Sequence, residues 1–258
     1  MAAKLAVVTG ASGGIGLEFA KQLARAGYDL ALVARSADKL QSVASQVKTE
    51  FGISAEPIAL DLSIDGAPHE LLARVPSCDV LINNAGFANT GKFAQIEERE
   101  IMEELQLDVV ALTQLTRLYL PRMLERRDGK ILNVASTAAF APGPTMAVYY
   151  ASKAYVLSFS EALAAEVRGT GVTVTVLCPG ATATGFQERA KVQSALLIRL
   201  GMADAGQVAK AGIDGMMRGK TLVVPGITNK LVAISPRIAP RSLLVWISGK
   251  LIEERGQR

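Results

Sequence analysis

The stretch "LAVVTGASGGIG", residues 5–16, decides the fold of this chain. An apolar run typical of a buried strand leads into a glycine-rich turn, and an amphipathic helical pattern follows from about residue 14 to about residue 26. Glycines at such a turn let backbone N–H groups approach a phosphate at a helix N-terminus, where the helix dipole favours negative charge. The spacing is G-x-x-x-G-x-G rather than G-x-G-x-x-G, so a tight turn without a ligand is the alternative interpretation.

The rest of the chain alternates between short apolar runs and longer amphipathic ones. Apolar runs at 29–35, 55–62, 78–86, 129–136, 171–180 and 221–225 predict further strands, and helices are expected near 37–51, 97–127 and 149–168. Strands that are apolar throughout and separated by helices indicate a parallel sheet covered on both faces. The sequence therefore predicts an α/β fold with a doubly wound parallel sheet, a Rossmann fold. We expect one domain over residues 1–225 and a C-terminal extension over 226–258.

Composition and charge exclude several classes of protein. Half of the 258 residues are apolar and a fifth are charged, which excludes a disordered or fibrous chain. The net charge of +4 lies in the C-terminal part: residues 220–258 contain seven Lys or Arg and two Glu, and the preceding residues contain 21 basic and 22 acidic side chains. Because no basic cluster is interleaved with aromatic residues, we expect no nucleic-acid binding.

Cysteine and histidine give no metal-site pattern. Cys78 and Cys178 form no CxxC pair or metal-ligand spacing, and the single histidine, His69, has no neighbouring partner, so we expect no metal and two reduced core thiols. The N-terminal segment leads into a β-branched run and resembles a first strand rather than a signal peptide. These features favour a cytoplasmic protein.

Three tyrosines surround one lysine in "AVYYASKAYV", residues 147–156. In a helix, Tyr149 and Tyr150 lie on the same face as Lys153, at i−4 and i−3, whereas Tyr155 at i+2 points elsewhere. Spacing alone leaves Tyr149 and Tyr150 as candidate partners of the lysine.

Nineteen residues after Gly16, the second predicted strand ends at Arg35. In dinucleotide-binding folds, an acidic residue near this point contacts the ribose of NAD, while an arginine accommodates the 2′-phosphate of NADP. Arg35 therefore favours NADP(H), and a solvated surface arginine is the alternative.

Together with "NNAG" at 83–86, "YYASK" at 149–153 and "CPGATAT" at 178–184, these motifs resemble the short-chain dehydrogenase/reductase family over nearly the whole chain. The resemblance implies an NADP-dependent oxidoreductase and a homodimer or homotetramer formed through the helices near 97–127 and 149–168. It also implies cofactor-binding positions from five motifs, namely Gly10, Ser12, Gly13, Gly14, Ile15 and Gly16, then Arg35, then Asp61 and Leu62, then Asn84, Ala85 and Gly86, and finally Pro179, Gly180, Thr182 and Thr184, together with Tyr149 and Lys153.

The family signature Tyr-x-x-x-Lys selects Tyr149 with Lys153, and Ser136 stands thirteen residues before Tyr149, as the resemblance requires. Tyr149 would exchange a proton with the substrate oxygen, Lys153 would lower the pKa of its phenol, and Ser136 would hydrogen-bond the same oxygen. Asp108 stands where the family usually has Asn. An ionised Asp accepts hydrogen bonds but cannot donate them, so the proton relay that the family builds on Asn is altered here.

The extension from 226 is apolar and basic, and its apolar runs are too short to span a membrane. Three interpretations stay open: a lid over an apolar substrate, a subunit contact, and a segment lying on a membrane surface. The sequence predicts reversible reduction of an apolar ketone, a 3-oxoacyl compound or a hydroxysteroid-like substrate. The alternatives are a catalytically weak NADP-binding regulatory or scaffold protein, suggested by Asp108, and an epimerase or dehydratase on the same fold.

Overall fold

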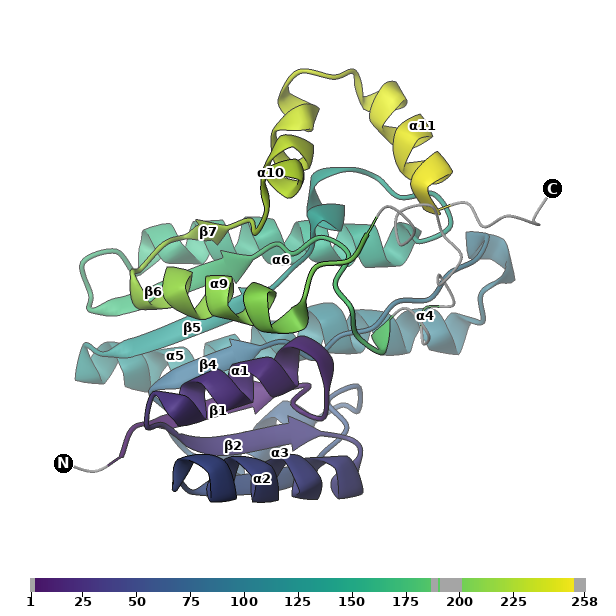
Figure 1. Ribbon diagram of the computed structural model, residues 1–258. Helices are drawn as coiled ribbons and strands as arrows, with labels where there is room; N and C mark the ends of the chain where they lie inside the picture. The colour runs from purple at the N-terminus through teal and green to yellow at the C-terminus, as the bar shows by residue number, and fades with distance from the viewer. Residues whose placement is uncertain (1–2, 187–189, 191–200, 253–258) are drawn as a thin grey trace.

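A seven-stranded parallel sheet forms the centre of the computed structural model, which describes residues 3–186, 190 and 201–252 (Figure 1). The strand order is β3-β2-β1-β4-β5-β6-β7. The strands are β1 (Leu5–Thr9), β2 (Asp29–Ala34), β3 (Ala55–Ala59), β4 (Val80–Asn83), β5 (Gly129–Val134), β6 (Val172–Leu177) and β7 (Leu222–Val223). The predicted doubly wound parallel sheet is confirmed, and each predicted apolar run contains one strand.

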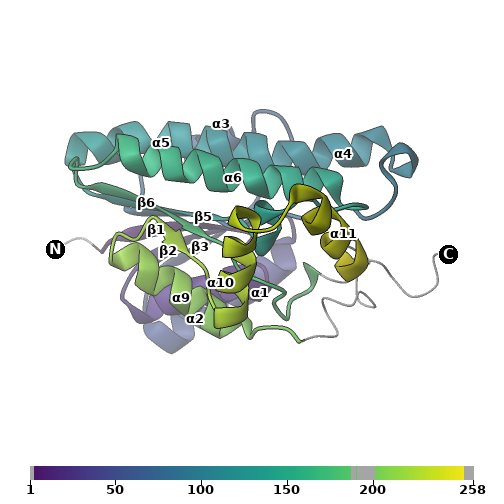
Figure 2. The same ribbon diagram turned by 90° about the horizontal axis from the view of Figure 1, so that it is seen from above.

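Helices cover both faces of the sheet (Figure 2). One face carries α1 (Gly14–Arg25), α2 (Ala37–Phe51) and α9 (Ala205–Met217); the other carries α3 (Ala67–Arg74), α4 (Glu98–Leu105), α5 (Leu112–Arg126) and α6 (Ala147–Glu166). Helices α3 and α9 were not expected from the sequence. Two short 3₁₀ turns, η1 (Phe93–Gln95) and η3 (Thr137–Phe140), complete this part of the chain.

The sheet divides the hydrophobic core into two layers. Successive strand residues point to opposite faces, so Val8 and Leu32 pack beneath α1 and α2 while Val7 and Val33 pack on the α3 and α5 side. All four are buried. The continuous apolar character of the strands therefore follows from burial on both faces.

The long helical region predicted over 97–127 is not one regular α-helix. Between α4 and α5, residues Gln106–Ala111 form a π-helical turn, η2. Leu107 and Asp108 in this turn are both buried. An extra residue in a helical turn changes the direction of the side chains that follow, which is why such turns often occur at functional sites.

The strand order reverses beside β1, whose neighbours are β2 and β4. Parallel strands end at the same edge of the sheet, so the loops after β1 and β4 leave in opposite directions and open a crevice between them. This places the turn at 10–14 beside residues 84–86, at the carboxyl ends of the strands.

The C-terminal segment projects beyond β7 as α10 (Ile227–Ile234), the 3₁₀ turn η4 (Ser235–Arg237) and α11 (Arg241–Ile252) (Figures 1 and 2). Residues 253–258 of the predicted extension lie outside the described residues. Within the described part of the chain, no helix combines the length and apolarity needed to cross a membrane.

Candidate active site

A cavity of about 500 Å³ opens at the carboxyl ends of the strands. It is lined by eighteen of the twenty predicted site residues: Gly10, Ser12, Gly13, Gly14, Ile15, Arg35, Asp61, Leu62, Asn84, Ala85, Gly86, Ser136, Tyr149, Lys153, Pro179, Gly180, Thr182 and Thr184. The two others, Gly16 and Asp108, lie behind this lining, and both are buried. The five cofactor-binding motifs, Ser136 and the Tyr149–Lys153 pair, spread over 175 residues of sequence, therefore meet around one cavity.

The glycine-rich turn forms the cradle at the start of α1. Gly14, the first residue of the helix, has φ of 56°, and a Cβ there would lie 2.9 Å from the Thr184 side chain. A Cβ on Gly16 would lie 2.2 Å from the carbonyl oxygen of Gly10. The helix start at Gly13 has no side-chain cap, so its first N–H groups face the cavity and suit a phosphate.

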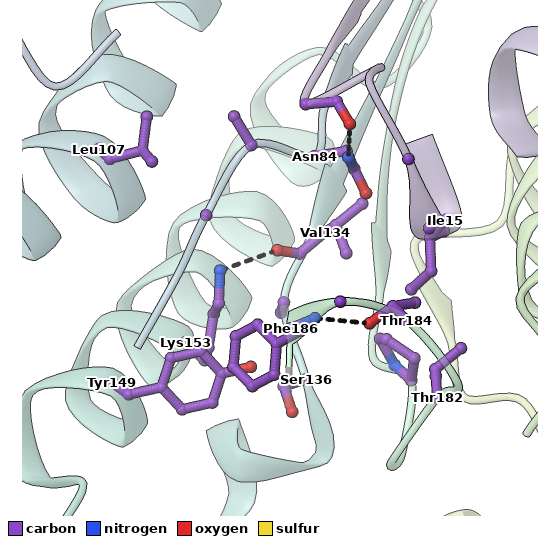
Figure 3. A pocket seen from close by; sticks show the side chains of 18 of the residues that line it. Ile15, Asn84, Leu107, Val134, Ser136, Tyr149, Lys153, Thr182, Thr184 and Phe186 are labelled. Carbon is purple, nitrogen blue, oxygen red and sulfur yellow. Dashed lines mark hydrogen bonds between the residues drawn. The ribbon is translucent and has the colours of Figure 1, made fainter. Parts of the chain in front are cut away.

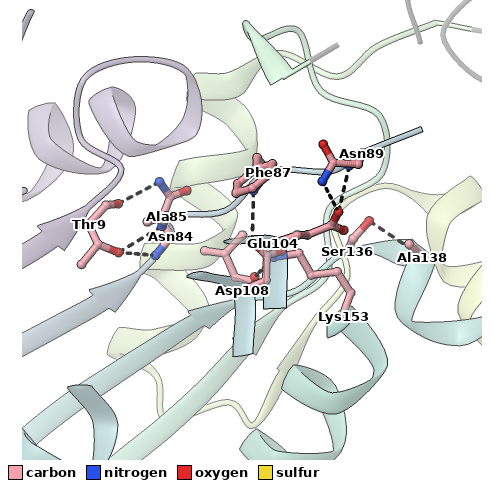
Figure 4. A network of polar contacts seen from close by, with 11 residues as sticks. Thr9, Asn84, Ala85, Phe87, Asn89, Glu104, Asp108, Ser136, Ala138 and Lys153 are labelled. Carbon is pink, nitrogen blue, oxygen red and sulfur yellow. Dashed lines mark hydrogen bonds and ion pairs between the residues drawn. The ribbon is translucent and has the colours of Figure 1, made fainter. Parts of the chain in front are cut away.

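Thr9 positions the loop after β4, a role that sequence reasoning missed. Its Oγ1 accepts hydrogen bonds from the backbone N–H groups of Asn84 (2.9 Å) and Ala85 (3.0 Å) and donates to the carbonyl oxygen of Ile82 (3.2 Å). The Asn84 side-chain amide donates in return to the Thr9 carbonyl oxygen at 2.9 Å (Figure 4). This reciprocal bonding joins the two loops that flank the crevice.

Positive charge gathers where the cavity meets the end of β2. Arg35 lies here, with its Nη1 3.8 Å from Asp61 Oδ2, and half of its side chain is exposed. Ser36 and Lys39 line the same end of the cavity and were not predicted. Helix α2 begins at Ala37, with Ser36 as its N-cap, and its first turn brings Lys39 to the side of the cavity where Arg35 lies.

Ser136, Tyr149 and Lys153 converge at the other end of the cavity (Figure 3). Tyr149 and Lys153 lie one turn apart on α6, and the Lys153 ammonium is 5.5 Å from the centre of the Tyr149 ring. Burial raises the pKa of Tyr149, while Lys153 and a hydrogen bond with Ser136 lower it. Lys153 therefore acts on the pKa of Tyr149 in the expected direction, and burial raises that pKa by more than the lysine lowers it.

The other two tyrosines occupy different surroundings. Tyr150 also lines the cavity, packs edge-on against Tyr149 at 6.1 Å between ring centres, and lies against Gly143. Tyr155 stacks on Phe159 and shares a 3.0 Å hydrogen bond with Thr113, outside the cavity lining. Of the two tyrosines that spacing left open, Tyr149 is the one coupled to both Lys153 and Ser136.

Lys153 forms a buried ion pair with Asp108, in which Nζ lies 2.9 Å from Oδ2 (Figure 4). The other carboxylate oxygen, Oδ1, accepts a hydrogen bond from the backbone N–H of Phe87 at 3.0 Å. Burial lowers the pKa of Lys153, but the charges of Asp108 and Tyr149 together raise it by more. The pKa is therefore raised overall, and the ammonium form is favoured. A π-helical turn on one element and α6 on the other thus place an acid and a base in contact.

A second buried carboxyl group, Glu104, lies one helical turn before Asp108. Its Oε2 accepts hydrogen bonds from the backbone N–H (2.9 Å) and side-chain amide (3.0 Å) of Asn89. Burial, the largest effect, and the charge of Asp108 raise the pKa of Glu104 to about 7. Sequence analysis missed Glu104, although its i−4 spacing from Asp108 was a usable signal.

Comparison with known proteins identifies this arrangement. The family model described as short chain dehydrogenase matches residues 4–194. The chain belongs to the short-chain dehydrogenase family. The very-long-chain 3-oxoacyl-CoA reductase of Mus musculus is 31% identical over 238 residues, which are 90% of this chain and 75% of that protein.

Two solved structures share both fold and sequence with this dehydrogenase. A short-chain dehydrogenase from Sphingobium yanoikuyae in complex with NADPH is 32% identical, with a TM-score of 0.82 over 87% of this chain and 88% of the other. The bulky-bulky ketone specific alcohol dehydrogenase from Comamonas testosteroni is 30% identical, with a TM-score of 0.77 over 87% and 86% of the two chains. The family resemblance drawn from the motifs is therefore confirmed, and the chain is an oxidoreductase of this family.

Beside Tyr149, the dehydrogenase has an apolar region that the motifs did not reveal. Met146, Tyr150, Phe186 and Ile252 line the cavity there, and Phe186 packs against the Tyr149 ring at 5.4 Å between ring centres. Ile252 comes from the end of α11, more than 100 residues after Tyr149 in the sequence. The C-terminal segment thus supplies part of the wall around the candidate proton donor.

Proposed function

We propose that this dehydrogenase uses NADPH to reduce the carbonyl group of an apolar ketone or 3-oxoacyl compound and oxidises the corresponding alcohol in reverse. The observation that carries the proposal is one continuous cavity that contains the glycine cradle, Arg35 and the Ser136, Tyr149 and Lys153 side chains. The NADPH complex of the Sphingobium relative supports the cofactor. The activity named for the mouse relative supports the substrate class.

The shape and chemistry of the cavity fit NADP(H). The absence of side chains at the glycine cradle lets the backbone approach a pyrophosphate closely, and the uncapped start of α1 offers N–H donors to the phosphate oxygens. Arg35 and Lys39 line the cavity and would supply positive charge for the 2′-phosphate, and Asp61 and Leu62 would hold the adenine. Pro179, Gly180, Thr182 and Thr184 line the cavity as well and would hold the nicotinamide. When bound, the cofactor supplies the hydride that reduces the carbonyl carbon.

The protein's own side chains manage the proton and the developing charge. Tyr149 donates its phenolic proton to the carbonyl oxygen, and Ser136 stabilises the negative charge that develops there by a hydrogen bond. Lys153 lowers the pKa of Tyr149 from the value that burial alone would set. Its ammonium group would also hold the nicotinamide ribose when the cofactor binds. Asp108 keeps the Lys153 ammonium charged and in place through the 2.9 Å ion pair.

The apolar wall favours a substrate with an apolar body beside its carbonyl group. The wall beside Tyr149 is formed by the uncharged side chains of Phe186, Met146 and Ile252. Ile252 belongs to α11, so this helix covers the substrate end of the cavity. A hydrocarbon chain placed there gains from burial at about 25 cal/mol per Å². The lid interpretation of the C-terminal extension is therefore part of the proposal.

One observation favours the rival proposal of a weak NADP-binding scaffold. Asp108 neutralises Lys153, which then opposes the high pKa of Tyr149 less effectively. An assay separates the reductase from the scaffold. Ketones of increasing chain length are tested with NADPH and with NADH, and turnover is followed by the absorbance of the reduced nicotinamide. Turnover that rises with chain length supports the reductase. Tight NADPH binding without turnover on any ketone or alcohol supports the scaffold.

A further inference from the structure

The C-terminal segment, residues 226–252, exposes an apolar surface that the proposed reductase does not use. Nine of the sixteen exposed large apolar side chains among the described residues belong to it. These nine, here called the C-terminal apolar surface, are Ile227, Leu231, Val232, Ile234, Ile238, Leu243, Val245, Trp246 and Ile247. Ile227 and Ile238 are at least 80% exposed and Trp246 is 63% exposed. Apolar surface concentrated in this way marks an interaction site.

The charge of the same segment has one sign. Lys230, Arg237, Arg241 and Lys250 are all exposed, and residues 226–252 contain no Asp or Glu. Cations placed among large apolar side chains and a tryptophan are the composition of segments that lie in the interface of an anionic membrane.

Helix α11 separates the interior of the protein from this surface. Leu244, Ser248 and Ile252 recur every four residues, are buried, and face the protein, with Ser248 donating to the Pro142 carbonyl oxygen. Trp246, two residues from both Leu244 and Ser248, lies on the opposite side of the helix. The helix that closes the cavity with one face therefore presents the C-terminal apolar surface with the other.

We propose that residues 226–252 dock on the surface of an anionic phospholipid membrane, with the C-terminal apolar surface in the headgroup region and Lys230, Arg237 and Arg241 against lipid phosphates. The charge pattern decides between a membrane and a second copy of this chain. A two-fold contact places the same patch on both sides, so Lys230, Arg237 and Arg241 of one copy would face a segment of the other copy that has no Asp or Glu over residues 226–252. Anionic headgroups supply the missing charge, at about fivefold in affinity per Lys or Arg.

The location of this surface has a consequence that rests on the proposed function. Ile252 of α11 lines the substrate end of the cavity, and on α10 the Asn229 side chain lies against Gly180 of the cofactor-side loop. A docked segment therefore holds the cavity next to the lipid, from which an apolar acyl chain enters without crossing water. Vesicle binding needs neither substrate nor turnover, so its failure and the failure of the reductase assay are separate results.

Trp246 is the single tryptophan of the chain and reports directly on docking. The full-length protein is mixed with vesicles of equal parts phosphatidylglycerol and phosphatidylcholine, and separately with phosphatidylcholine vesicles. We expect a blue shift of Trp246 emission, quenching by lipids brominated near the headgroup, and co-sedimentation with the anionic vesicles. Binding should weaken at least tenfold between about 0.1 M and about 1 M salt, because added salt screens the cations. An unshifted emission on anionic vesicles would overturn the proposal.

Two paired variants test which side chains carry the binding. Arg237→Glu with Arg241→Glu should lower anionic vesicle affinity at least about thirtyfold, and Ile238→Ser with Leu231→Ser should lower it at low and high salt alike. The control variants Lys48→Glu and Ile64→Ser change exposed side chains elsewhere and should leave binding unchanged. Circular dichroism verifies folding. If the Ile238 and Leu231 variant instead halves the mass in solution while no variant changes vesicle binding, the surface is a contact between copies and the membrane proposal is wrong.

Discussion

The Nζ atom of Lys153 lies 2.9 Å from Oδ2 of Asp108, and both side chains are buried. These two residues act on Tyr149 in opposite directions: after burial, which raises its pKa most, Lys153 lowers the pKa and Asp108 raises it. An ammonium group paired in this way is held firmly but contributes a weaker net field at the phenol. The acidity of the proposed proton donor is therefore set by a pair of residues from α6 and the π-helical turn.

We expect the Asp108→Asn variant to retain or exceed the activity of the parent and to shift its pH dependence. Asn keeps an acceptor for the Phe87 N–H but removes the negative charge, so the pKa of Tyr149 falls. Alcohol oxidation, which needs the phenolate, should then reach half its maximal kcat/KM at a lower pH than in the parent. The Asp214→Asn change, at a partly exposed carboxylate on α9 outside the cavity lining, is the control. A large loss of turnover at every pH would mean that the carboxylate has a chemical role of its own.

Tyr149→Phe should abolish turnover and leave NADPH binding within about twofold, because it removes the proton donor but keeps the ring that packs on Phe186. General acid catalysis supplies about 10² to 10⁴-fold, and kcat should fall by that range. Tyr150→Phe, at the neighbouring position in the same cavity, is the matched control and should be mild. Steady-state kinetics decide the assignment, which is wrong if Tyr150→Phe is the inactive variant.

Arg35→Ala should weaken NADPH by about ten- to a hundredfold and leave NADH nearly unchanged, because an ionic hydrogen bond to the 2′-phosphate contributes about 1.5 to 3 kcal/mol. Asp61 lies 3.8 Å from Arg35 and partly neutralises its charge. We therefore expect the loss of NADPH affinity to lie near the lower end of this range. Fluorescence titration with both cofactors measures it. Arg74→Ala on α3 is the control, and an equal effect on NADH and NADPH would refute the role of Arg35.

Glu104 should make the protein less stable as pH rises from about 5 to about 8. Its pKa is raised from 4.5 to about 7, first by burial and then by Asp108, against the hydrogen bonds from Asn89 and the charge of Lys153. Because the pKa of Glu104 is higher in the folded than in the unfolded state, its contribution to the free energy of unfolding is fully present below about pH 4.5 and is lost as pH rises through about 7. Urea unfolding across this window tests it.

The Glu104→Gln variant should flatten this pH dependence and be more stable than the parent at pH 8 by on the order of 1 to 3 kcal/mol. Glu103→Gln, at the adjacent and partly exposed position paired with Arg99, should leave the dependence unchanged. If the parent and Glu104→Gln lose stability in parallel between these pH values, Glu104 contributes nothing to the pH dependence and the interpretation fails.

Ile252→Ala should raise KM for long-chain ketones by about threefold to tenfold and leave short ketones unaffected, because it removes apolar surface from the substrate end of the cavity. Ile247→Ala on the exposed side of the same helix is the matched control. Kinetics with ketones of two chain lengths give the answer. An equal change for both chain lengths would show that α11 affects folding or cofactor binding rather than the substrate.

Local patterns in the sequence were sufficient for the fold and for most of the cavity lining. A strand buried on both faces must be apolar throughout, and a glycine cradle needs glycine where Gly14 has a positive φ and where Gly16 approaches the Gly10 carbonyl. Both constraints act within a few residues, so both are visible in one chain. The turn chemistry then places the flanking motifs at one edge of the sheet, because parallel strands all end there.

Only the tertiary structure decided how buried charges and distant segments meet. The contact of Asp108 with Lys153 depends on how a π-helical turn packs against α6, and the raised pKa of Glu104 depends on burial, which no spacing reports. Likewise, amphipathic periodicity did not show that α11 would turn Ile252 into the cavity and Trp246 to the outside. Long-range packing determines which charges lose water and which apolar faces stay exposed, and these two outcomes set the chemistry and the partners proposed for this protein.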